Sequence, residues 1–169
     1  MKKLKIIIAA FLSIFLTASC ASSSTAKDDD IEVVTSFYPI YVIAENVIGN
    51  TEGISLKNMA QPQTGCLHDY QLSTGDMKKL STADIFVING GGMESFLDNA
   101  LELFPELNIV DTSDGVTELL NEHSEHDGHN HEENSHFWIL PSNAAVQAQN
   151  ICSALSALCP DKSGVFENN

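Results

Sequence analysis

The sequence contains no arginine, and its few basic residues are unevenly distributed. The 169 residues include 8 lysines and 23 acidic residues, which gives a formal net charge of −15. Three of the lysines lie in residues 1–19, which hold no acid, so the rest of the chain carries a net charge of −18. A surface of this sign repels the phosphates of nucleic acid and attracts cations. Nucleic acid is therefore not an expected partner.

The sequence also lacks an apolar run long enough for a permanent membrane helix. The run IIIAAFLSIFL at 6–16 has eleven residues, whereas about 20 are needed to cross a bilayer. It lies between the basic MKKLK and the small residues TAS, so we assign residues 1–19 to a signal peptide. LTASC resembles a bacterial lipobox, which makes Cys20 a lipidated residue and 20–30 a flexible tether. The alternative is an ordinary secreted protein with an incidental cysteine.

Cysteine is scarce, and beyond Cys20 its number is odd. Cys66, Cys152 and Cys159 cannot all pair within the chain. If Cys152 and Cys159 share a helix, their Cα atoms lie roughly 10 Å apart, which is too far for a disulfide. We therefore expect buried free thiols.

Segments with strand and helix patterns alternate along residues 31–158. Apolar, β-branched runs predict strands, and helical periodicity with caps or prolines predicts helices. The expected order is strand 31–37, helix 38–50, strand 54–60, helix 73–83, strand 84–89, helix 93–104, strand 108–113 and helix 142–158. This alternation predicts an α/β fold with a parallel four-stranded sheet flanked by helices. Ligands of such folds collect at the carboxyl ends of the strands.

Two of the six histidines stand apart by their location. Residues 121–136, NEHSEHDGHNHEENSH, hold five histidines and five acids. His68 follows the second predicted strand, and His136 ends the loop after the fourth, so both belong to the same edge of the sheet. Either alone could be structural or merely exposed, but imidazole suits zinc and other late divalent metals. Phe137 and Trp138, which follow His136, are expected to pack rather than to touch metal.

Two apparent motifs do not support the chemistry that they suggest. HEENSH at 131–136 separates its histidines by five positions, about 140° around a helix, unlike the HExxH signature of metalloproteases. INGGGMES at 88–95 lacks the Gly-Lys-Ser/Thr ending of a phosphate-binding loop and the full GxGxxG spacing. A tight turn is the expected role of its glycines.

The motifs around His68 and His136 resemble those of the zinc- and manganese-specific solute-binding lipoproteins of bacterial ABC transporters. VVTSFYPIY resembles the opening strand and turn of that family, HDYQLSTGDMKKLSTADIFVINGGGMESFLD its first-ligand segment, and HFWILPSNA its second-ligand motif. The resemblance covers about residues 31–169. It implies that His68 and His136 bind Zn²⁺, with Mn²⁺ as the alternative, and that an ABC permease is the partner. It also implies a non-enzymatic lipoprotein anchored on the extracytoplasmic face of the membrane.

The resemblance further implies a domain organisation. Residues 31–160 correspond to the N-terminal lobe of a two-lobe protein, and 161–169 to the start of the inter-lobe helix. The family takes a third histidine and an acidic ligand from the second lobe, and no histidine follows His136 here. We therefore expect a truncated chain whose site is open and weaker.

The histidine-rich segment 121–135 resembles the mobile acidic loop that zinc members of the family carry before the second ligand. It has no apolar face to bury, so we expect it to stay mobile. Its histidines are candidates for auxiliary metal capture: His123, His126, His129 and His131. The alternative is a solvated loop without a role.

Two other function classes stay open on sequence alone. Two histidines with open coordination could activate water in a zinc hydrolase, although no well-placed general base is visible. An adhesin-type lipoprotein would bind its partner even after chelation of metal.

Overall fold

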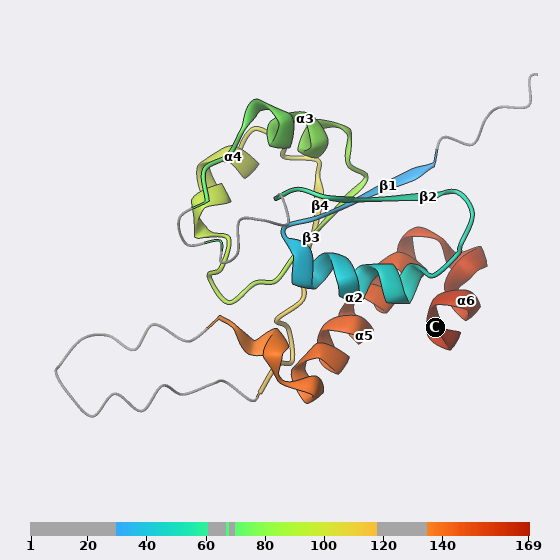
Figure 1. Ribbon diagram of the computed structural model, residues 1–169. Coiled ribbons are helices and arrows are strands. Elements are labelled where there is room, and N and C mark those ends of the chain that lie inside the picture. The colour runs from blue at the N-terminus through green and yellow to red at the C-terminus, as the bar shows by residue number, and fades with distance from the viewer. Residues whose placement is uncertain (1–29, 61–66, 68–69, 118–134) are drawn as a thin grey trace, which may run out of the picture.

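The computed structural model describes residues 30–60, 67, 70–117 and 135–169 (Figure 1). The predicted signal peptide, Cys20, Cys66, His68 and the four loop histidines lie outside these residues. Within the described ranges, no helix has the length and apolar character needed to cross a membrane.

A parallel four-stranded sheet forms the centre of the fold. Its strands are β1 (Ile31–Thr35), β2 (Ile54–Asn58), β3 (Ile85–Ile88) and β4 (Asn108–Asp111), in the spatial order β2-β1-β3-β4. Val33 in β1 lies opposite Leu56 in β2 and Ile85 in β3, and all neighbouring strands are parallel. The predicted α/β fold is confirmed. Each strand ends one or two residues before its predicted end.

Helices cover both faces of the sheet. α2 (Tyr38–Ile48), α5 (Pro141–Leu158) and α6 (Ser163–Asn168) lie on one side, and α3 (Thr74–Thr82) and α4 (Asp98–Leu101) lie on the other (Figure 1). Because successive side chains of a strand point to opposite faces, Val33 joins the buried cluster under α2 and α5, whereas Val34 joins the one under α3. Burial on both faces explains why the two central strands, β1 and β3, are apolar runs.

The main helices begin at the signals that the sequence carries. α2 starts after extended Phe37 with Pro39 in its first turn, and α5 has Pro141 as its first residue. α3 is preceded by its N-cap Ser73, whose side chain accepts a hydrogen bond from the backbone N–H of Asp76 in a full capping box. These three predicted helices are confirmed.

The helix predicted over 93–104 is wrong in extent. The chain forms the short 3₁₀ helix η3 (Ser95–Leu97) followed by one turn, α4. Residues 93–94 stay in a turn because the Glu94 carboxylate accepts hydrogen bonds from backbone N–H groups at the end of β3. Local helix propensity does not report such a partner. Leu97 is buried as its periodicity predicts, but Leu103 is 68 % exposed.

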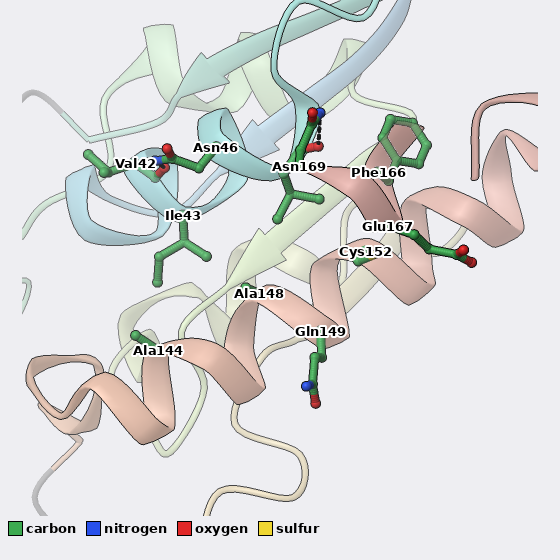
Figure 2. Close-up of a pocket in the computed structure, with 11 residues that line it drawn as sticks. Val42, Ile43, Asn46, Ala144, Ala148, Gln149, Cys152, Phe166, Glu167 and Asn169 are labelled. Carbon is green, nitrogen blue, oxygen red and sulfur yellow. Dashed lines mark hydrogen bonds between the residues drawn. The ribbon is translucent and has the colours of Figure 1, made fainter. Parts of the chain in front are cut away.

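The described C-terminal residues pack back onto the helical layer. η5 (Pro160–Lys162) leads into α6, whose Phe166 is buried in the cluster beneath α2 and α5. A groove of about 360 Å³ lies between α2, α5 and α6 (Figure 2). Its lining includes the half-buried thiol of Cys152, and Cys159 nearby in sequence is buried; both are free. The assignment of 161–169 to an inter-lobe helix stays a prediction.

Candidate metal site

The carboxyl ends of the strands form one edge, because all four strands are parallel. The residues that follow the strands there are Ser36, Met59, Asn89 and Thr112. Backbone hydrogen bonds continue the ladder past the strands: the Met59 N–H donates to Thr35 O at 2.8 Å, and the Thr112 N–H donates to Ile88 O at 3.1 Å. The edge is therefore a fixed platform for the segments that lie on it.

His136 lies on this platform, at the start of the 3₁₀ helix η4 (Phe137–Ile139). Its half-buried ring is 5.1 Å from the ring of Trp138, with an interplanar angle of 41°. The Trp138 ring in turn meets Phe37 edge-on, at 4.9 Å and 82°, and Phe37 follows directly on the end of β1. These contacts place His136 near the end of β1. Phe137 is buried and Trp138 packs against the core, as predicted.

The segment before His136 is held by the side chain of Asn89. Its Nδ2 donates to the carbonyl oxygens of Gly90, at 2.9 Å, and Ser135, at 3.0 Å. Its Oδ1 accepts from Gln147 Nε2 at 3.1 Å, and Gln147 Nε2 also donates to Thr112 Oγ1 at 2.9 Å. We call Asn89, Gln147, Thr112 and Ser135 the Asn89 network. All four residues are buried, so their hydrogen bonds lie in a low-dielectric environment that strengthens them.

A second amide holds the segment after His136. Asn143, buried on α5, donates from Nδ2 to the carbonyl oxygen of Phe137 at 3.1 Å. Asn143 and Gln147 occupy the same buried stripe of α5 as the apolar Ile151 and Leu155. The helix thus presents two amides, one turn apart, to the loop that carries His136.

The triple-glycine turn after β3 binds a carboxylate of the chain itself. Glu94 Oε1 accepts from the Asn89 N–H at 2.8 Å, and Oε2 accepts from the Gly90 N–H at 3.1 Å. Burial raises the pKa of Glu94, while these two N–H groups lower it, and the net direction is upward. The tight turn predicted for INGGGMES is confirmed. Gly91 has φ +60°, and a Cβ there would lie 2.6 Å from the Phe137 ring, so η4 packs on bare backbone.

Two described residues flank His68 in the chain, and both are fixed. Leu67 is fully buried in the cluster beneath α2 and α5, and Tyr70 and Trp138 pack against that same cluster. The Tyr70 N–H donates to Leu67 O at 2.9 Å, and the Tyr70 ring meets Phe96 at 5.5 Å. The chain on either side of His68 therefore belongs to the same hydrophobic cluster as the aromatic neighbour of His136.

Asp76 on α3 holds Tyr70 and Ser73, and its partner Lys79 also bonds to Met59, which follows β2. Its Oδ2 accepts from the Tyr70 hydroxyl at 2.7 Å and from the Ser73 N–H and hydroxyl at 2.9 and 2.7 Å. Lys79 donates to Asp76 Oδ1 at 3.3 Å and to the carbonyl of Met59 at 2.6 Å. We call Asp76, Tyr70, Ser73 and Lys79 the Asp76 network.

The pKa values of the two acids in this network move in opposite directions. Burial raises the pKa of Asp76, but the hydrogen bonds from Ser73, Tyr70 and Lys79 outweigh it, and the net direction is downward. Burial and the adjacent carboxylate raise the pKa of the Tyr70 phenol. Asp76 is therefore an ionised, fully bonded acceptor at neutral pH.

The described ranges contain one of the six predicted metal-binding histidines, His136. His68, His123, His126, His129 and His131 lie outside the described residues. Within those ranges no three His, Cys, Asp or Glu side chains come together in a way that could hold a metal ion. The pairing of His68 with His136 accordingly stays a prediction.

Sequence reasoning missed the polar residues that hold the candidate site. The sequence patterns predict only a strand end at Asn89 and helical residues at Glu94 and Gln147. One signal was available for Gln147: it recurs at four-residue spacing with Asn143, Ile151 and Leu155, so a polar residue occupies the apolar stripe of a helix. Polar residues on a buried stripe indicate a hydrogen-bonded partner across the interface.

Comparison with known sequences decides the family. The family model described as zinc-uptake complex component A, periplasmic (ZnuA), matches residues 33–169. The chain belongs to the ZnuA family. Among curated relatives of this ZnuA-family chain, the zinc-binding lipoprotein AdcA of Streptococcus pneumoniae is 31% identical over 100% of the chain. The high-affinity zinc uptake system protein ZnuA of Bacillus subtilis is 28% identical over 97% of it.

Solved structures give the same assignment. The Zn(II)-bound ZnuA-like domain of S. pneumoniae AdcA superposes with a TM-score of 0.67 at 26% identity, covering 82% of this chain and 48% of that one. The Mn-bound periplasmic metal binding protein of Candidatus Liberibacter asiaticus gives 0.67 at 25% identity, covering 80% and 48%. The chain spans 34% of the length of AdcA and 54% of the length of B. subtilis ZnuA.

Proposed function

We propose that this ZnuA-family chain is the zinc-binding N-terminal lobe of a solute-binding lipoprotein that captures Zn²⁺ outside the membrane. Its task is binding and delivery to an ABC permease, not catalysis, and Zn²⁺ is the cargo. Cys20 is the proposed point of lipid attachment, after removal of residues 1–19. The two zinc-binding relatives and the Zn(II)-bound structural neighbour support this function.

One observation carries the proposal for the ligands. His136 lies half-buried at the carboxyl edge of the sheet, and its neighbour Trp138 packs against the same cluster as Leu67 and Tyr70, which flank His68 in the chain. We propose that His68 and His136 together bind the ion. Two imidazoles leave coordination positions for water or further ligands, which makes such a site exchangeable. Exchange suits a protein that must release its cargo.

The strong negative charge supports capture of a cation. With 23 acidic residues against 8 basic ones, the chain attracts divalent ions over a range set by ionic strength. The proposed role of His123, His126, His129 and His131 is transient, weaker binding that feeds the main site.

Zinc titration of paired histidine variants tests this function. Changing both His68 and His136 to Ala is expected to remove the tightest Zn²⁺ equivalent in calorimetry. Changing the four loop histidines to Ala, the matched control, is expected to keep that equivalent and remove only weaker ones. Unchanged stoichiometry and affinity in the His68/His136 variant would contradict the proposal.

Manganese is the second candidate cargo, because a structural neighbour is Mn-bound. Nitrogen ligands favour Zn²⁺ over Mn²⁺, as the Irving–Williams order also does. Competition between the two ions for the wild-type chain is therefore expected to favour Zn²⁺ strongly. Equal or tighter binding of Mn²⁺ would make manganese the cargo.

A further inference from the structure

We propose that Asn89 is a positioning residue for His136: its amide fixes the backbone in front of the imidazole and so sets the ring for metal binding. The inference rests on the proposed function only for its metal readout.

The amide of Asn89 has a single allowed orientation. Nδ2 donates to two carbonyl oxygens, those of Gly90 and Ser135, and Oδ1 accepts from Gln147 Nε2. A flipped amide would point oxygen at two acceptors and nitrogen at a donor. Because Asn89 is fully buried, water cannot replace any of these partners. The side chain is therefore locked.

The backbone of Asn89 is locked as well. Its N–H donates to Glu94 Oε1 at 2.8 Å, and its carbonyl oxygen accepts from Thr112 Oγ1 at 3.1 Å. The residue follows directly on β3, a strand paired on both sides. The position of Asn89 Nδ2 is thus set by the sheet and not by the loop that its amide holds.

This fixed donor acts on His136 through one peptide plane. The carbonyl of Ser135 and the N–H of His136 belong to the same planar group, so the bond from Asn89 sets the orientation of that plane. On the other side of His136, the Asn143 side chain holds the carbonyl of Phe137. These two bonds hold the backbone on both sides of His136, and the Trp138 ring at 5.1 Å limits the side-chain torsions of His136. Metal–nitrogen distances tolerate about 0.2 Å of error, so a displaced backbone lowers affinity.

Replacing Asn89 by Ala leaves the buried carbonyl of Ser135 without its donor. A buried, unpaired carbonyl is costly, so the segment is expected to move towards water. Outer partners of metal ligands typically change affinity by 10- to 100-fold. Because Asn89 holds the backbone and not the imidazole itself, we expect a loss of about tenfold, at the lower end of that range.

A second asparagine provides a matched control. Asn150 on α5 also donates from Nδ2 to two backbone carbonyls, those of Thr112 at 3.0 Å and Asp114 at 2.8 Å. Neither of these bonds reaches Ser135 or Phe137, the residues on either side of His136. Asn150→Ala therefore removes two amide-to-carbonyl hydrogen bonds of the same type from the same edge of the sheet without releasing His136, whereas Asn89→Ala removes two such bonds and the one accepted from Gln147.

Zinc affinity is measured by chelator competition, with ZnCl₂, in a chain whose four loop histidines are Ala. Asn89→Ala is expected to bind Zn²⁺ about tenfold more weakly and Asn150→Ala to bind as the parent does. Equal affinities of both variants would overturn the inference and leave the proposed function intact. A parent that does not bind Zn²⁺ would instead contradict the proposed function.

A metal-free measurement tests the positioning directly. The Trp138 ring shifts the NMR resonances of the His136 imidazole protons, and those shifts depend on the relative position of the two rings. Asn89→Ala is expected to move them towards values of an unstructured histidine, and Asn150→Ala to leave them in place. Unmoved resonances in a folded Asn89→Ala chain would overturn the inference.

Gln147→Met covers the case in which Asn89→Ala does not fold. Methionine has similar length, so α5 can keep its packing, while the bond that orients Asn89 Oδ1 is lost. A smaller change in the same direction, in both zinc affinity and the His136 resonances, is expected. A zinc affinity and His136 resonances equal to those of the parent chain would overturn the inference.

Discussion

The described residues that neighbour the two predicted ligands in the chain are held in chemically different ways. The Asp76 network secures Tyr70, two positions after His68, through an ionised carboxylate with four donors. The Asn89 network secures the residues before His136 through neutral amides. Hydrogen bonds to a charged group are stronger, but they depend on protonation. The hydrogen bonds of the Asp76 network are therefore the stronger ones but depend on ionisation, whereas those between the amides do not.

The difference follows from the surroundings of each segment. Asp76 lies in the first turn of α3, where a carboxylate is favoured by the helix N-terminus, and Lys79 one turn later is partly exposed. Asn89 lies between the sheet and α5 and is fully buried. A charge there would need a partner of opposite sign, and amides avoid that cost.

Removing the charged centre is expected to have the largest effect on stability. Asp76→Ala loses the capping box and the bonds to Tyr70 and Lys79, so the free energy of unfolding should fall by about 3 kcal/mol. Urea denaturation measures it. A fall below about 1 kcal/mol, as for an exposed ion pair, would show that the carboxylate does not hold this segment.

The second-largest expected effect on stability comes from a steric change in the glycine turn that follows Asn89. Gly91→Ala places a methyl group against the Phe137 ring at a positive φ, whereas Gly92→Ala has the positive φ but no atom within 4 Å. The expected losses in free energy of unfolding are about 2 and about 1 kcal/mol. Thermal or urea denaturation of both variants gives the difference. Equal losses would mean that η4 does not pack on the turn.

The smallest expected effect is a change with pH, and it separates the two networks. The folded state lowers the pKa of Asp76. Its stabilisation is therefore complete above the unfolded pKa, about 3.9, and is lost as pH falls through the lower, folded value. The stability gap between wild type and Asp76→Asn, about 1.5 kcal/mol at pH 6, should close in acid.

The corresponding gap between wild type and Asn89→Ala should stay constant over the same range, because the amide does not titrate. Urea denaturation at pH 3 to 6 supplies both curves. A gap for Asp76→Asn that does not narrow in acid would remove the contrast between the networks.

The architecture could be predicted from the sequence because its signals are local. β-Branched runs such as IEVVT, the capping box at Ser73 and the prolines at helix starts each act within a few residues. The alternation of strands and helices then leaves few topologies. The prediction of a helix over 93–104 was wrong because the Glu94 carboxylate takes its hydrogen-bond partners from the end of β3. Helix periodicity does not report such a contact.

The support of the candidate site could not be predicted in this way. Asn89 reaches Ser135 across 46 positions and Gln147 across 58. Neither spacing leaves a pattern in one sequence. His136 was found because a histidine at a strand edge suggests chemistry by itself, whereas an asparagine or glutamine acquires its purpose only from the partner that folding brings to it.

The contact between His136 and Trp138 also makes the candidate site optically accessible. The chain has one tryptophan, and its indole lies against the imidazole and the ring of Phe37. Indole emission responds to the electric field and to quenching groups around the excited ring. Light at the red edge of indole absorption therefore excites a fluorophore located at this histidine, without any added label.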